Sequence, residues 1–197
     1  MQLGKRKRDD QSWLIGGIMK LEALKSMIPD YGRDIRLNLE SVLNTETAPG
    51  LTPQQLWGVA LSCAYALESK ALVDMIAEEG AGHLEDVTRE AARGAATIMA
   101  MNNVYYRSMH LIGDADLKAL PARLRMNVIG KPGIPKADFE LMCFAISAIA
   151  GCGQCLSSHL HELHKASITN EGAQSALKIA SVLQAAERAL AIGEMAS

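Results

Sequence analysis

Aromatic residues are scarce in this sequence, whose 197 residues include two Phe, two Trp and four Tyr. Hydrophobic residues make up 49% of the chain. They are mostly Ala, Leu, Ile and Met, which favour packed helices over strands. A chain of this length buries one ordinary core. We therefore predict an all-α protein in which residues 19–197 form a single helical domain.

A strong net charge and a long apolar run are also lacking. The 20 Lys and Arg against 22 Asp and Glu leave a formal net charge of -2, which argues against nucleic acid or an anionic membrane as a partner. No run of about 18 apolar residues exists to span a bilayer, and no small-residue cleavage site follows the short WLIGGIM. We predict a cytoplasmic protein. Residues 1–18 are expected to be a flexible, non-essential extension, whose KRKR is a solvated end rather than a nuclear signal.

Helical patterns follow one another along most of the chain. Apolar spacing predicts helices over 21–28, 35–42, 54–67, 69–79, 85–106 and 170–197. Thr52 is expected to cap the third of these helices, with Pro53 at N1 and Gln55 at N3. Residues 124–140, rich in Gly and Pro, predict a connector. Asp138 is the expected N-cap of the helix that follows.

A shift of 85 residues lays parts of the chain over one another. It places LWGVALSCA (56–64) over LMCFAISAI (141–149), and residues 91–98 over 176–183. We interpret the match as an internal duplication with halves near 54–107 and 138–192. The first half is then a helical scaffold copy, and the second half carries the chemistry.

The stretch FELMCFAISAIAGCGQCLSSHLHELH (139–164) holds the candidate reactive residues. Cys152 and Cys155 stand at the head of an expected helix, where the first-turn N–H groups and the helix dipole favour a thiolate. Cys155 and His159 are at positions i and i+4 and share a helix face. Glu140, one helix earlier, is suited to fix the tautomer of His159 and to stabilise its charged form. Nucleophile, second thiol, base and carboxylate make a complete set for cysteine redox chemistry.

A CxxC pair has three interpretations. A thioredoxin-like protein needs alternating strands and helices, which the surrounding pattern lacks. Zinc ligation by both cysteines and two histidines fits a tetrahedron poorly, because His159 and His161 point to opposite sides of a helix. We favour a dithiol peroxidase or reductase without a metal. His161 and His164 are then exposed surface, and Cys63 and Cys143, on apolar helix faces, are inert core residues.

Five segments are more informative together than the CxxC pair. They are LEALKSMIPDYGRDIRLNL (21–39), QQLW (54–57), AATIMAMNNVYYR (95–107), LRMNVIGKPGIPKADFEL (124–141) and FAISAIAGCGQCLSSH (144–159). With them the chain resembles the alkyl hydroperoxide reductases of the AhpD type, in the carboxymuconolactone decarboxylase-like superfamily. The resemblance implies an all-helical protein, usually a trimer, that binds no cofactor. It implies reduction of peroxides with electrons from dihydrolipoamide, carried by a lipoylated acyltransferase, and regeneration of a peroxiredoxin of the AhpC type.

The resemblance also assigns roles by position. Cys155 resembles the cysteine that becomes a sulfenic acid. Cys152 resembles the proton donor that closes the disulfide and forms a mixed disulfide with the peroxiredoxin. Glu140 and His159 resemble the family's proton relay. The family pattern has a histidine directly before the second cysteine, whereas this chain has Gln154, which hydrogen-bonds but carries no proton near neutral pH.

The departure at Gln154 predicts a shorter proton relay with an auxiliary role for the glutamine. The alternative function is a redox-sensing or binding module on the same helical scaffold, whose disulfide reports oxidation without useful turnover. A lactone decarboxylase is a weaker option, because such an enzyme has no need of paired thiols.

Overall fold

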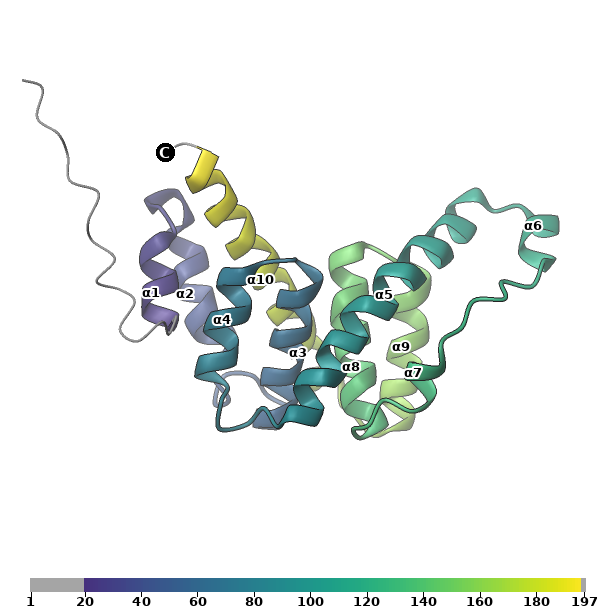
Figure 1. The fold of residues 1–197 in the computed structure, drawn as a ribbon, viewed down its shortest axis with the longest axis horizontal. Coiled ribbons are helices and arrows are strands. Elements are labelled where there is room, and N and C mark those ends of the chain that lie inside the picture. Colours follow the sequence, from purple (N-terminus) through teal and green to yellow (C-terminus); the bar gives the residue numbers. More distant parts are fainter. Residues whose placement is uncertain (1–19, 196–197) are drawn as a thin grey trace, which may run out of the picture.

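The computed structural model describes residues 20–195, and the predicted extension 1–18 lies outside the described residues. Within this range every regular element is helical, so the predicted all-α class is confirmed (Figure 1). The elements in order are α1 (Leu21–Met27), the 3-10 turn η1 (Asp30–Gly32), α2 (Arg33–Val42), α3 (Pro53–Ala66), α4 (Lys70–Glu79), α5 (Asp86–Ile112), α6 (Ala115–Ala119), α7 (Asn127–Gly130), α8 (Lys136–Ala150), α9 (Gly153–Lys165) and α10 (Asn170–Met195). None of the described helices is long and apolar enough to cross a membrane.

Two helices, α3 and α8, form the centre of the molecule. Every residue from 56 to 64 on α3 and from 139 to 147 on α8 is buried, so both helices are covered on all sides. They pack against each other, and α5 and α10 each contact both of them. The helix α9 packs on α8 and α5. This arrangement packs one face of the CxxC helix, with Cys155 and Leu163 buried, against α8 and α5.

The start of α3 is the expected capping box. The Thr52 hydroxyl accepts from the Gln55 N–H, the Gln55 side chain accepts from the Thr52 N–H, and Pro53 is at N1. Gln55 also donates to Asp138 Oδ1 at 2.7 Å, which ties α3 to α8. Asp138 was therefore wrongly predicted as an N-cap: it lies in the first turn of α8, which is capped by Pro135.

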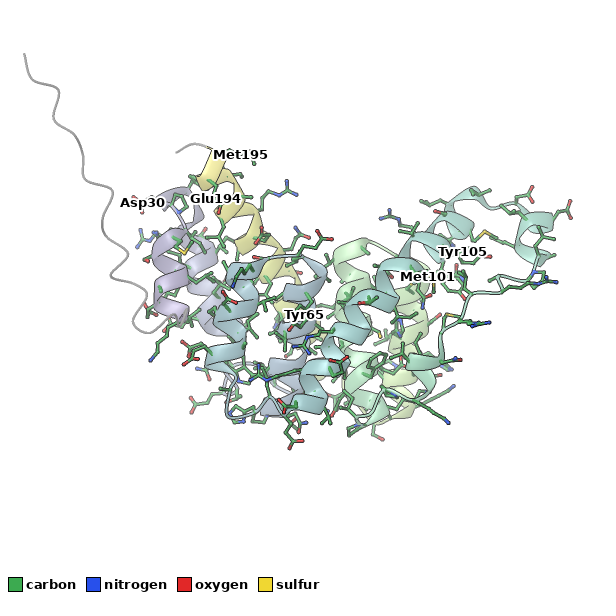
Figure 2. The ribbon with its side chains drawn as sticks, viewed as in Figure 1. Asp30, Tyr65, Met101, Tyr105, Glu194 and Met195 are labelled. Carbon is green, nitrogen blue, oxygen red and sulfur yellow. A yellow bond between two sulfur atoms is a disulfide. The ribbon has the colours of Figure 1, made fainter. Side chains whose placement is uncertain are left out.

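A projecting arm, residues 110–121, departs from the sequence-based expectation. The helix α5 was expected to end at residue 106, but it continues to Ile112 and ends at Gly113, whose φ of +72° is left-handed. The arm then turns through α6 and returns along an extended segment (Figure 1). Figure 2 shows Met101 and Tyr105 on the part of α5 that leads into it. Every residue of the arm is exposed.

The helix order in the two halves repeats. The helices α3, α4 and α5 begin at residues 53, 70 and 86, and α8, α9 and α10 begin at 136, 153 and 170. The differences are 83, 83 and 84 residues, close to the shift of 85 found in the sequence. Common descent of the two halves remains a prediction.

Candidate active site

The two cysteines of the CxxC pair lie where α8 turns into α9. The turn is made by Gly151, whose φ of +66° lies in the left-handed region that glycine adopts without strain. Cys152 caps α9, and its Sγ accepts from the Cys155 N–H at 3.2 Å. Cys152 and Cys155 form a disulfide, with Cα atoms 5.3 Å apart. The structure thus brings the pair together at a helix N-terminus, as the sequence predicted.

Behind the pair lies a buried carboxylate and a histidine. Glu140 Oε2 lies 2.6 Å from His159 Nδ1, and both side chains are largely buried. A buried carboxylate is costly unless it is paired and hydrogen-bonded, and His159 satisfies that requirement. Because Nδ1 of His159 is engaged by Glu140, Nε2 is the ring nitrogen left for chemistry. The predicted Glu140–His159 contact is present.

One cavity, which we call the thiol cavity, joins Cys155 and His159 to solvent. Its volume is about 310 Å³. It is lined by Met99, Asn102, Tyr106, Met126, Ile129, Gln154, Cys155, Ser158 and His159. Cys155 lines the cavity and is 6% exposed, whereas Cys152 is 0% exposed and does not line it. A small electrophile that enters the cavity therefore meets the sulfur of Cys155 and the ring of His159.

Two further cysteines and the two further histidines of α9 lie as predicted from the sequence. Cys63 and Cys143 are buried and unpaired. Burial raises the pKa of the Cys63 thiol to about 12, against a hydrogen bond from Ser62 that lowers it. His161 and His164 are exposed on α9, so neither shares the cavity with Cys155.

Among residues 20–195 no three or more His, Cys, Asp or Glu side chains are grouped so that they could hold an ion.

Gln154 is exposed at the rim of the thiol cavity and also lines the adjoining hollow beside Tyr105 and His110. A glutamine at this rim has an amide that can hydrogen-bond a molecule that enters, and its auxiliary role stays a prediction.

Comparison with known proteins identifies the family. Residues 115–196 match the model of the Carboxymuconolactone decarboxylase family. The alkyl hydroperoxide reductase AhpD of Rhodospirillum centenum is 49% identical over 167 residues, which are 85% of this chain and 88% of that protein. The AhpD of Streptomyces griseus is 50% identical over 85% of this chain and 93% of its own length. The AhpD of Brucella canis is 46% identical over 87% and 97%.

The chain belongs to the AhpD family. In this AhpD-family protein the thiols, the base and the carboxylate were predictable from the sequence, whereas the wall of the thiol cavity that α5 supplies was not predicted. Met99, Asn102 and Tyr106 lie at positions i, i+3 and i+7, which is one face of a helix. This spacing within the segment 95–107 could have indicated that the three side chains share one face of the helix.

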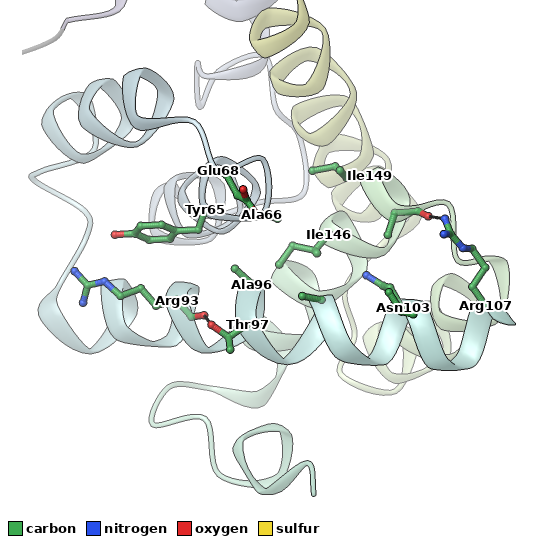
Figure 3. A pocket seen from close by; sticks show the side chains of 13 residues that line it. Tyr65, Ala66, Glu68, Arg93, Ala96, Thr97, Asn103, Arg107, Ile146 and Ile149 are labelled. Carbon is green, nitrogen blue, oxygen red and sulfur yellow. Dashed lines mark hydrogen bonds between the residues drawn. The ribbon is translucent and has the colours of Figure 1, made fainter. Parts of the chain in front are cut away.

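The AhpD-family fold also contains a larger second cavity on another face of α5 (Figure 3). Its volume is about 660 Å³, and its lining includes Tyr65, Arg93, Asn103, Arg107 and Ile146. It contains no thiol and no histidine, so its size does not make it the site of redox chemistry. The Arg107 guanidinium donates to the carbonyl of Ala150, and so holds the end of α8 directly before the CxxC turn.

Proposed function

We propose that this protein is a thiol peroxidase that reduces alkyl hydroperoxides through a Cys152/Cys155 dithiol–disulfide cycle. The observation that carries the proposal is the position of Cys155. It lines a cavity beside His159, is bonded to Cys152, and is backed by the buried Glu140–His159 contact. The names of the AhpD relatives, alkyl hydroperoxide reductases, support the same reaction class.

The oxidative half of the cycle follows from these groups. The Cys155 thiol gives its proton to His159, and the thiolate attacks the outer oxygen of the hydroperoxide. A sulfur–oxygen bond forms and the oxygen–oxygen bond breaks, which leaves a sulfenic acid on Cys155 and an alkoxide that takes a proton to become the alcohol. The Cys152 thiol then attacks the sulfur of Cys155, and the disulfide and water are the products.

The reductive half needs two electrons from a dithiol. Dihydrolipoamide, presented by a lipoylated acyltransferase, supplies them and becomes the cyclic disulfide. In the oxidised structure Cys155 is the more exposed residue of the pair, and Cys152 is closed off. The mixed-disulfide role predicted for Cys152 therefore requires the turn at Gly151 to open when a partner docks. No bound cofactor takes part in this cycle.

Three features of the biological setting complete the proposal. The first is a peroxiredoxin of the AhpC type as the protein that the dithiol regenerates. The second is a homotrimer as the working assembly. The third is the cytoplasm, because a reducing compartment keeps a dithiol available for turnover.

Steady-state turnover with reduced lipoamide and a small alkyl hydroperoxide tests the proposal. We expect Cys155→Ser to abolish peroxide reduction, because the nucleophile is lost. Cys152→Ser should still react with peroxide once but should not close the disulfide. Cys63→Ser is the matched control, and its turnover should stay close to that of the unmodified protein because this thiol is buried away from the cavity.

Full activity in Cys155→Ser would overturn the mechanism. A protein whose disulfide forms and is reduced, but which shows no sustained turnover, would instead favour the redox-sensing alternative.

A further inference from the structure

Two adjacent asparagines on α5 lack partners in the core. Asn102 is 4% exposed and Asn103 is 3% exposed. Among residues 20–195 every buried side-chain nitrogen or oxygen without a hydrogen bond belongs to this pair: Oδ1 of Asn102, and Nδ2 and Oδ1 of Asn103. Each of these unpaired atoms lowers stability, and each is free to form a hydrogen bond with a molecule that enters a neighbouring cavity.

The two side chains face different cavities. Neighbouring residues on a helix point about 100° apart, as its 3.6 residues per turn require. Asn102 lines the thiol cavity together with Cys155 and His159, whereas Asn103 lines the second cavity (Figure 3). The same residue type, with similar burial, thus borders the proposed chemistry at one position and not at the next.

The reacting group of the proposed substrate matches the free acceptor of Asn102. A hydroperoxide carries a single donor, the O–H of its outer oxygen, and this is the oxygen that the Cys155 thiolate attacks. The apolar side chains of Met99, Tyr106 and Ile129 suit the alkyl group in the same cavity. The terminal torsion of an Asn side chain is broad, so Oδ1 can turn toward a group that enters.

We propose that Asn102 binds the hydroperoxide, with Oδ1 accepting the O–H of the outer oxygen and so aligning the oxygen–oxygen bond with the sulfur of Cys155; this role rests on the proposed peroxidase function. Asn102 transfers no proton. The outer oxygen keeps its hydrogen as it moves to sulfur, so the same hydrogen bond holds the sulfenic acid. The alkoxide takes its proton from the Cys152 thiol, the donor that the resemblance implies. The Cys152 thiolate then closes the disulfide, and the hydroxide released takes the proton that His159 received from Cys155.

The test compares Asn102→Leu with Asn103→Leu in the full-length protein. Leucine is similar in size to asparagine and favours a helix. The fully reduced proteins are mixed with tert-butyl hydroperoxide, and the rate of disulfide formation is followed by rapid quenching and thiol counting. We expect Asn102→Leu to lower this second-order rate by about 5- to 100-fold, the range for a lost hydrogen bond, and Asn103→Leu to change it less than about twofold.

Two further rates show whether the effect belongs to the peroxide. Reduction of the disulfide by dihydrolipoamide should be the same in all three proteins. Reaction of the reduced proteins with methyl methanethiosulfonate, an electrophile with no donor hydrogen, should also be unchanged, because the Cys155 thiolate itself is unaffected. Asn102→Ala, checked by circular dichroism, serves as the second variant if the leucine variant does not fold.

The proposal is overturned if Asn102→Leu reacts with peroxide as fast as the unmodified protein. Equal losses in the Asn102 and Asn103 variants, or an equal loss toward methyl methanethiosulfonate, would also overturn it, because either result shows a structural defect. An unmodified protein that does not react with peroxide would refute the proposed function itself, which is a different outcome.

Discussion

All four cysteines are buried, but pairing and position beside the thiol cavity divide them into two chemical kinds. Cys152 and Cys155 are paired beside the thiol cavity, whereas Cys63 and Cys143 are unpaired inside α3 and α8. Burial, and then the nearby charge of Glu140, raise the pKa of Cys143 well above its ordinary value. A thiol that does not ionise is neither a nucleophile nor a target of oxidation. The proposed redox chemistry is therefore confined to the Cys152/Cys155 pair.

The buried thiol of Cys63 predicts a pH dependence of stability. Its pKa rises from 9.0 in the unfolded chain to about 12 in the folded protein, so between these values the thiol ionises only on unfolding. The stability that comes from keeping the Cys63 thiol neutral is fully present below about pH 9 and is lost as the pH rises toward 12. Above pH 9 the unfolding free energy of the unmodified protein should fall more steeply with pH than that of Cys63→Ala. The difference between the two slopes should be about 1.4 kcal/mol per pH unit. Parallel pH profiles in urea denaturation would contradict this expectation.

Position 154 tests the proton relay. Gln154 lies at the cavity rim but cannot carry a proton, so transfer depends on His159 and Glu140. We expect Gln154→His to raise peroxidase turnover near neutral pH by about tenfold at most. His159→Ala and Glu140→Ala should each lower turnover more than Gln154→Ala does, because general acid–base assistance is worth about 10²- to 10⁴-fold. Steady-state turnover between about pH 6 and pH 8 measures all four. If Gln154→Ala were the most damaging change, the glutamine would have a direct role.

At the scale of the elements, the corner between α8 and α9 depends on one glycine. Cys152 lies between Gly151 and Gly153, but of these two glycines only Gly151 has a left-handed φ, of +66°. Gly153 is the first residue of α9. A Cβ added to either glycine meets no atom within 4 Å, so backbone conformation is the difference between them.

Paired alanine variants test this corner. We expect Gly151→Ala to lower the unfolding free energy by about 1 kcal/mol, because alanine is disfavoured in the left-handed region. Gly153→Ala should leave stability unchanged or raise it slightly, since alanine is the better helix former. Denaturant unfolding under oxidising conditions measures both. A similar decrease in unfolding free energy in both variants would mean that steric crowding, rather than the left-handed φ of Gly151, causes the destabilisation.

At the scale of the whole molecule, the arm exposes apolar side chains that no other part of the described chain covers. Leu111, Ile112 and Leu120 are 74%, 59% and 62% exposed, and α6 buries no residue. Exposed apolar side chains gathered on one projection are typical of a protein contact surface. In a homo-oligomer the neighbouring copies would cover them.

Assembly is therefore expected to depend on the arm. Light scattering should report a multiple of the 21.2 kDa chain mass for the unmodified protein at micromolar concentration. Leu111→Glu together with Leu120→Glu should shift it toward the monomer, because a charge cannot be buried unpaired at a contact. The control is Ile192→Glu, on α10, where the isoleucine is also exposed but lies off the arm. A monomeric unmodified protein would exclude the predicted trimer.

Local signals accounted for most of the helices. The capping box at Thr52 and the periodic apolar residues of α3 and α4 were predicted closely. Asp138 was misassigned because a residue that can cap a helix is also suited to a cross-helix hydrogen bond, here with Gln55. The continuation of α5 to Ile112 was not predicted. The last residues of the helix, 110–112, are exposed, so they lack the apolar periodicity of a helix that packs on the core.

The sequence by itself determined the helical class and the reactive pair, because spacing on a helix and residue chemistry are local properties. The family resemblance singled out His159 and Glu140, but their contact at 2.6 Å depends on the packing of α9 against α8. Only the tertiary structure decided which sulfur faces the cavity, and that α5 supplies its opposite wall with Asn102. Those facts depend on how α5, α8 and α9 pack together, and packing between segments far apart in the chain is not encoded in the spacing within any one of them.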